Sequence, residues 1–315
     1  MKTDSSSWIS NPRPALSSPS LAFVFPAFTS DYRNHPAGGV PGFENRFTHF
    51  IKIAAEIADS RLSTFHFLDH PLLDNELLTQ YVTYAYSCAL SSLLRDAGHS
   101  PSLSAGYSMG IYAALCDAGS ISFETGLHLV ASAYQAIEQA LGPRDFGMGA
   151  VIGLDRSDIQ HLIDRHGLAA EITNQNAGHA YVVSGRGEAV TRLLELATCE
   201  GALHTRNLQV TVPYHSVHLQ PAATLFSKTV AELDIRPPST PLLSLIDQGE
   251  LTGPGEIRRE VLRNLYQPLN WSLAMKRILD QGISGFVECG PSEGLSRNAR
   301  FVEGVIFFPP ASLLS

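Results

Sequence analysis

The chain has 315 residues, of which 44% are hydrophobic and 17% are charged, as in ordinary soluble globular enzymes. Its formal net charge of −8 argues against nucleic acid as the main partner, because neutralising phosphates requires a basic surface. No apolar run approaches the roughly 18 residues that a membrane-spanning helix needs, so the sequence predicts no membrane partner.

The first 146 residues alternate short apolar runs with long helical patterns. Residues 1–20 are polar and rich in Ser and Pro, and we expect a disordered extension there. Apolar runs at 21–25 and 102–105 predict strands buried on both faces, as in a parallel sheet. Long helices between short apolar strands indicate an α/β fold. The helical patterns lie at 44–60, 77–97, 111–116 and 123–140.

The pattern changes over residues 147–211, where the predicted order is β-α-β-β-α-β, the signature of a ferredoxin-like module. We therefore predict a catalytic body with a parallel sheet, formed by 21–146 and 212–315, into which a small subdomain of 147–211 is inserted. The module's strands are predicted at 148–154, 168–173, 180–184 and 204–212, and its helices at 157–165 and 188–201. Helices then return at 217–233, 255–265 and 271–282, with strands at 241–246 and 284–288.

The motif G-x-S-x-G at Gly106–Gly110 stands between a predicted strand and a predicted helix. This is the pattern of a nucleophile elbow, in which a sharp turn exposes the serine and free N–H groups of the helix face the developing oxyanion. We therefore expect Ser108 to be an acyl-accepting nucleophile. A serine needs a base to attack at neutral pH, and the best placed of the 12 histidines is His215, which follows the module's last strand.

Five motifs in order resemble those of the malonyl-CoA:acyl carrier protein transacylases, over nearly the whole chain from residue 21. The family's sequences at these places are F-P-G-Q-G, G-H-S-x-G, a V-P-S-H-like motif, R-Q-L-Y-N-P-V-x-W and E-x-G-P-G. The resemblance implies an α/β-hydrolase-like large subdomain carrying the ferredoxin-like small one. The matching segments here are Phe25-Pro26, Gly106–Gly110, Val212–His215, Arg263–Trp271 and Glu288–Pro291.

The resemblance also implies a mechanism. Ser108 would be acylated with His215 as base, and the imidazole would be oriented by a main-chain carbonyl at Asn264. The backbone N–H groups of Phe28 and Met109 would form the oxyanion hole. The implied reaction is ping-pong, with no bound cofactor. Its substrates would be phosphopantetheine thioesters, either acyl-CoA or an acyl-carrier protein, and an acyl carrier protein would be the partner.

One departure from the family concerns the acyl group itself. Ala133 stands where the malonyl enzymes carry an arginine that grips the free carboxylate of malonate. Burying that carboxylate without a partner would cost several kcal/mol, so malonyl is disfavoured and an uncharged, longer acyl chain is expected. Arg144 is an alternative source of the missing charge.

Further departures lie around the expected acyl pocket, which we predict from Phe28, Tyr107, Ala133 and Tyr214. Phe28 replaces the family's glutamine, and it either makes the pocket more apolar or simply packs. Tyr107 replaces the histidine of G-H-S, and Ile111 replaces a glutamate. We expect these two changes to remove hydrogen bonds around an intact elbow.

The cysteine and histidine spacings predict no metal. Four widely spaced cysteines indicate reduced thiols in a cytoplasmic protein. His66 and His70, and also His215 and His218, have helical spacing but lack the H-E-x-x-H arrangement.

Basic side chains near the C-terminal third are either solvated faces or the local patch that an acidic carrier protein needs. The leading hypothesis is a discrete, monomeric acyltransferase that moves a non-malonyl acyl group in polyketide or other secondary-metabolite biosynthesis. The alternatives are a hydrolase of the same fold that clears stalled carrier proteins, and a docking module without activity. The basic residues in question are Arg258, Arg259, Arg263, Lys276 and Arg277.

Overall fold

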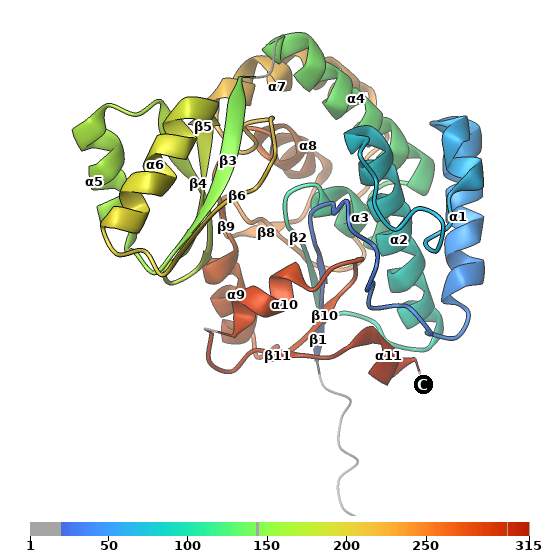
Figure 1. Cartoon of the computed structure of the whole chain (residues 1–315). Helices are drawn as coiled ribbons and strands as arrows, with labels where there is room; N and C mark the ends of the chain where they lie inside the picture. Colours follow the sequence, from blue (N-terminus) through green and yellow to red (C-terminus); the bar gives the residue numbers. More distant parts are fainter. Residues whose placement is uncertain (1–19, 143–144, 301, 315) are drawn as a thin grey trace, which may run out of the picture.

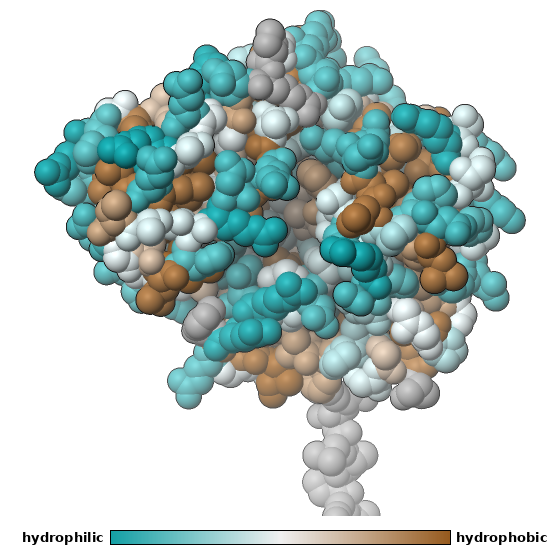
Figure 2. Space-filling model, viewed as in Figure 1, coloured by the Kyte–Doolittle hydropathy of each residue, from teal (hydrophilic) through white to brown (hydrophobic). Residues whose placement is uncertain are grey.

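The computed structural model describes residues 20–142, 145–300 and 302–314. The predicted extension of 1–20 lies outside the described residues, except for Ser20. The chain forms two lobes, each built on its own sheet (Figure 1). Figure 2 shows a hollow between the lobes, and the ribbons of β2 and α3 lie behind it in the view of Figure 1.

The large lobe carries a six-stranded sheet in the order β11-β10-β1-β2-β7-β8. All neighbouring strands are parallel except β7 and β8, which are antiparallel. This confirms the α/β class with a mainly parallel sheet. The strands are β1 (Leu21–Phe25), β2 (Leu103–Gly106), β7 (Leu242–Leu243), β8 (Glu250–Leu251), β10 (Gly285–Glu288) and β11 (Ile306–Phe307).

Helices cover both faces of this sheet. Side chains of β1 alternate between the two faces, so each face has its own apolar cluster. Phe23 and Phe25 pack toward α2 and α3, whereas Ala22 and Val24 pack toward α9. No helix in the described ranges is long and apolar enough to cross a membrane. The helices are α1 (Phe43–Ile57), η1 (Ser60–Thr64), α2 (Glu76–Asp96), α3 (Gly110–Asp117), α4 (Phe123–Leu141), η2 (Val217–Leu219), α7 (Gln220–Glu232), α8 (Pro254–Arg263), α9 (Trp271–Asp280), α10 (Gly294–Ala299) and α11 (Pro310–Leu313).

The small lobe has the ferredoxin-like arrangement, with its sheet in the order β6-β3-β5-β4-β9. Its own strands pair antiparallel, and α5 (Arg156–His166) and α6 (Gly187–Cys199) cover one face. A fifth strand, β9 (Leu269–Asn270), comes from beyond the predicted insertion and pairs parallel with β4. The others are β3 (Phe146–Ile152), β4 (Ala170–Ala177), β5 (Ala180–Arg186) and β6 (His204–Asn207), so the last strand is shorter than predicted.

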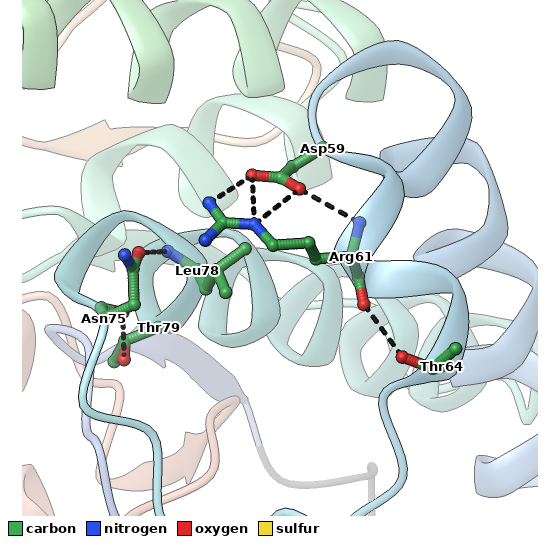
Figure 3. A network of polar contacts seen from close by, with 6 residues as sticks. All are labelled: Asp59, Arg61, Thr64, Asn75, Leu78 and Thr79. Atoms are coloured by element: carbon green, nitrogen blue, oxygen red, sulfur yellow. Dashed lines mark hydrogen bonds and ion pairs between the residues drawn. The ribbon is translucent and has the colours of Figure 1, made fainter.

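Local caps fix the start of α2, which borders the site described below (Figure 3). The Asn75 side chain accepts the N–H of Leu78 at 3.0 Å, and the Thr79 hydroxyl donates to the Asn75 carbonyl at 2.9 Å. A side-chain oxygen at this position satisfies one of the N–H groups that the first turn of a helix leaves unpaired. Nearby, Asp59 caps η1 through the N–H of Arg61 and also binds its guanidinium.

Candidate active site

The turn from β2 into α3 holds Ser108 in a left-handed conformation, with φ of 56°. The N–H of Tyr107 donates to the Phe25 carbonyl at 2.8 Å, which attaches the turn to β1. A Cβ at Gly106 would collide with the main chain of α3, and one at Gly110 would collide with the Phe25 carbonyl. The two glycines are therefore required for the close approach of strand and helix, as the elbow motif predicts.

Ser108 precedes the inserted segment of the small lobe in the chain, and His215 follows it. The fold brings their side chains together. The Ser108 Oγ lies 2.8 Å from Nε2 of His215, and both residues are buried. His215 also adopts a left-handed conformation, with φ of 62°, and its N–H donates to the Leu265 carbonyl at 2.8 Å. This distance allows direct proton transfer between the hydroxyl and the imidazole.

Burial lowers the pKa of His215 to about 4, because a desolvated ring resists protonation. The main-chain carbonyls of Asn264 and Gln267 oppose that shift. Within the described residues, Nδ1 has no hydrogen-bond partner of good geometry, so orientation by the Asn264 carbonyl stays a prediction. Asn264 has a further contact that the sequence did not suggest: its Nδ2 donates to the Ser108 carbonyl at 3.1 Å.

A small cavity adjoins Ser108, with a volume of about 10 Å³, which is room for about one water molecule. Ala133 and Tyr214 line it, and their contact with an acyl group stays a prediction. The cavity shows little of the extra room expected from Ala133, and large side chains from α2, α3 and α4 line it. The remaining lining residues are Gln80, Met109, Tyr112, Tyr134, Ile137, Asn264 and Leu265.

Phe28 lines a separate, wider pocket of about 480 Å³ that shares Tyr134 with the cavity. Its ring meets that of Tyr214 edge to face, with centroids 6.2 Å apart. The Tyr214 hydroxyl donates to the Glu76 carboxylate at 2.5 Å, and Gln80 donates to the same oxygen at 3.2 Å. These contacts hold the wall between the cavity and the wider pocket.

Tyr107 does not line this cavity, so a place for it in the acyl pocket stays a prediction. Its side chain turns toward β4, where the hydroxyl donates to Asn176 Oδ1 at 2.8 Å and accepts from Asn174 Nδ2 at 2.9 Å. The prediction that Tyr107 loses hydrogen bonds at this position is therefore wrong. Ile111, in the place of the family's glutamate, is buried in the apolar core.

The five basic residues differ in their surroundings. Arg258 donates to the carbonyls of Val230 and Leu233 at the end of α7, and Arg263 pairs with Asp247. These two guanidinium groups therefore bind other residues of the large lobe. Arg259, Lys276 and Arg277 are exposed, and carrier-protein docking by them stays a prediction. Arg144, the alternative source of positive charge, lies outside the described residues.

Ile137 and Gln80 are site residues that the sequence reasoning missed. Ile137 lies one helical turn after Ala133, so the predicted position of Ala133 would have placed it on the same face. Gln80 and Tyr112 come from two other helices, and no local pattern brings them to Ser108.

A buried serine with positive φ at the end of a parallel strand, hydrogen-bonded to a buried histidine, is the arrangement found in enzymes that form acyl-serine intermediates. The family model described as "Acyl transferase domain" matches residues 52–299, and the chain belongs to this family.

Named relatives and solved structures agree with this assignment. The malonyl CoA-acyl carrier protein transacylase of Bacillus subtilis is 26% identical over 287 residues, 88% of each chain. The polyketide biosynthesis protein ThaF of Burkholderia thailandensis is 30% identical over 279 residues, 85% of this chain but 23% of ThaF. The transacylase structure from Coxiella burnetii superposes with a TM-score of 0.85 at 28% identity, covering 94% of this chain and 96% of that one. A malonyl-transacylase in complex with a type II polyketide synthase acyl-carrier protein has a TM-score of 0.81 at 25% identity, covering 94% and 97%.

Proposed function

We propose that this acyltransferase carries a short, uncharged acyl group on Ser108 between pantetheine thioesters, with a holo-acyl carrier protein as one partner. The carrier protein is inferred from the family relative that is in complex with one. The likeness to ThaF supports a role in polyketide biosynthesis. The single observation that carries the proposal is the small cavity, with Ala133 in its wall, beside a serine bonded to a neutral histidine.

The reaction would proceed in two matched halves. His215 Nε2 takes the proton of Ser108 as Oγ attacks the thioester carbonyl. The N–H groups of Met109 and Phe28 have no acceptor among the described residues, so they are available to the oxyanion. The C–S bond then breaks and the departing thiolate takes the proton from the imidazolium. The acceptor thiol repeats these steps in reverse, which leaves Ser108 free.

Charge and size both favour a short uncharged acyl group. Among the described residues that line the cavity, none is lysine or arginine, so a malonyl carboxylate there would be desolvated without a cationic partner. The small volume of the cavity, about 10 Å³, favours a short acyl group over a long chain. Transfer is favoured over hydrolysis because the chain belongs to an acyltransferase family, and because a cavity with room for about one water would have to hold the acyl group as well as the attacking water.

The test is loading of the enzyme from acetyl-, butyryl-, octanoyl- and malonyl-CoA, followed by intact mass. We expect an acetyl adduct that is lost in Ser108→Ala and discharged by a holo carrier protein. Faster loading by malonyl-CoA than by acetyl-CoA would overturn the proposal of an uncharged acyl group. Loss of that malonyl loading in Arg144→Ala would indicate that Arg144 binds the malonyl carboxylate. Release of free acid without an acceptor would indicate the hydrolase, and the absence of any adduct would favour the docking module.

A further inference from the structure

Strand β4 of the small lobe is hydrogen-bonded to both loops that carry the catalytic residues. On the nucleophile side, Asn174 and Asn176 bind the hydroxyl of Tyr107, the neighbour of Ser108. On the base side, the Glu171 carboxylate accepts the N–H of Val217 at 3.0 Å, two residues after His215. The two loops come from distant parts of the chain, so β4 is a shared support for them.

The contact between β4 and Tyr107 involves a protonated hydroxyl, a buried amide and an irregular stretch of the strand. Burial raises the pKa of the Tyr107 phenol to about 12, so the hydroxyl remains protonated and can donate. Asn174 is 3% exposed, so losing its partner would leave a buried amide unpaired. The pairing of β4 with β5 shifts register between Ile172 and Asn174 and again between Gln175 and Ala177. Such irregularities redirect side chains, and they are common beside active sites.

β4 is also fixed to the large lobe independently of Tyr107. It pairs with β9, and Asn270 Nδ2 donates to Gln175 Oε1 at 3.2 Å. β9 follows the segment that carries Asn264, whose side chain binds the Ser108 carbonyl. A strand held in this way can fix the positions of the two catalytic loops relative to each other.

We propose that β4 positions the Ser108–His215 pair, and that Tyr107 is the positioning residue on the nucleophile side. The inference rests on the acyl-Ser108 chemistry proposed above. Ser108 and His215 both have positive φ, a conformation that persists in residues other than glycine only when the surroundings impose it. The Tyr107 main chain is held by β1 and its side chain by β4, so the turn has no freedom to relax. Without the hydroxyl, the distance of 2.8 Å between Oγ and Nε2 would lengthen.

The test compares Tyr107→Phe with Tyr181→Phe as a matched control. Tyr181 is buried, whereas Tyr107 is half-buried. The Tyr181 hydroxyl donates to the Gly178 carbonyl at 2.7 Å, but its ring packs toward α5 and α6. The reactivity of Ser108 is read with a fluorophosphonate probe, which needs an activated serine and no particular acyl group. The acylation rate from acetyl-CoA is read beside it as kcat and KM, together with melting temperature and pH profile.

We expect Tyr107→Phe to slow labelling and lower kcat roughly ten- to hundredfold with KM little changed, because small misplacements of reacting groups have effects of that size. We also expect the apparent pKa of the acylation rate to rise, since a looser pair lets water reach His215. Tyr181→Phe should lose melting temperature alone. Asn176→Ala should reproduce the kinetic effect and add little to it in the double variant with Tyr107→Phe.

Equal labelling rates for wild type and Tyr107→Phe would overturn the inference. So would a loss of melting temperature in Tyr107→Phe with kcat and pH profile unchanged, because that is a purely structural role. Should Tyr107→Phe not fold, Asn176→Ala decides by the same criteria. A wild-type protein that reacts with neither the probe nor any thioester counts against the proposed function, whereas a reactive wild type with equally reactive variants counts against β4 alone.

Discussion

In the proposed mechanism, the protonation of His215 sets the pH range over which Ser108 can be acylated. Burial lowers the pKa of its imidazole to about 4, against 6.5 for an ordinary histidine. At pH 5 a group with a pKa of 4 is about nine-tenths neutral, whereas one with a pKa of 6.5 is only about 3% neutral. Because only the neutral ring accepts the serine proton, the two cases differ roughly thirtyfold in rate at that pH.

The assay is the single-turnover rate of acylation by acetyl-CoA at constant ionic strength, from about pH 4 to about pH 8. We expect a plateau that extends down to about pH 5, followed by a fall centred near pH 4. The unfolded chain binds the proton more tightly than the folded one, so the stability that His215 contributes falls between pH 6.5 and 4. Circular dichroism at each pH must therefore show that the enzyme is folded. A rate that halves near pH 6.5 would refute the reasoning.

Three further predictions concern stability and specificity. Burial raises the pKa of Glu260 to about 7, so its carboxyl destabilises the fold as pH rises through 7, and Glu260→Gln should raise the melting temperature at pH 8 but not at pH 5. An unchanged difference at the two values would contradict this. Gly110→Ala should lower the free energy of unfolding in urea by about 2 kcal/mol or more, whereas Gly255→Ala, where a Cβ meets open space, should be nearly neutral. Ile137→Ala should enlarge the cavity and raise kcat/KM for octanoyl-CoA relative to acetyl-CoA by about tenfold, and an unchanged ratio would place the acyl chain elsewhere.

The features that the sequence predicted well are those with strong local signals. Apolar runs located β1 and β2, helical periodicity located α1 to α4, and motifs located Ser108 and His215. The strands β8, β9 and β11, which the sequence did not predict, have two residues each, and β7 is shorter than the predicted strand at 241–246. Strands of that length have no periodicity, and they exist because a distant partner offers hydrogen bonds. β9 illustrates this, since it joins the small sheet only through β4.

The shape of the acyl cavity was not predictable in the same way. The sequence showed that Ala133 replaces an arginine, but vacated volume stays open only if no neighbour fills it. Tyr112, Ile137 and Gln80 line the cavity from three helices, and no local pattern in the sequence places them there. Likewise, tyrosine in the place of the family's histidine at position 107 indicated a loss of hydrogen bonds. The sequence does not reveal that Asn174 and Asn176 of β4 bind the tyrosine hydroxyl.

In the proposed mechanism, the burial that keeps His215 neutral over a wide pH range also limits how acyl-Ser108 can be resolved. A water molecule attacking the ester needs space beside Ser108, and the cavity offers about 10 Å³, which the acyl group itself would occupy. An acceptor thiol on a flexible pantetheine arm instead enters from outside and brings its own proton to the neutral imidazole. On this reasoning the acyl-enzyme is long-lived until a thiol arrives, so the accuracy of transfer depends on water exclusion at Ser108 as much as on recognition of the carrier protein.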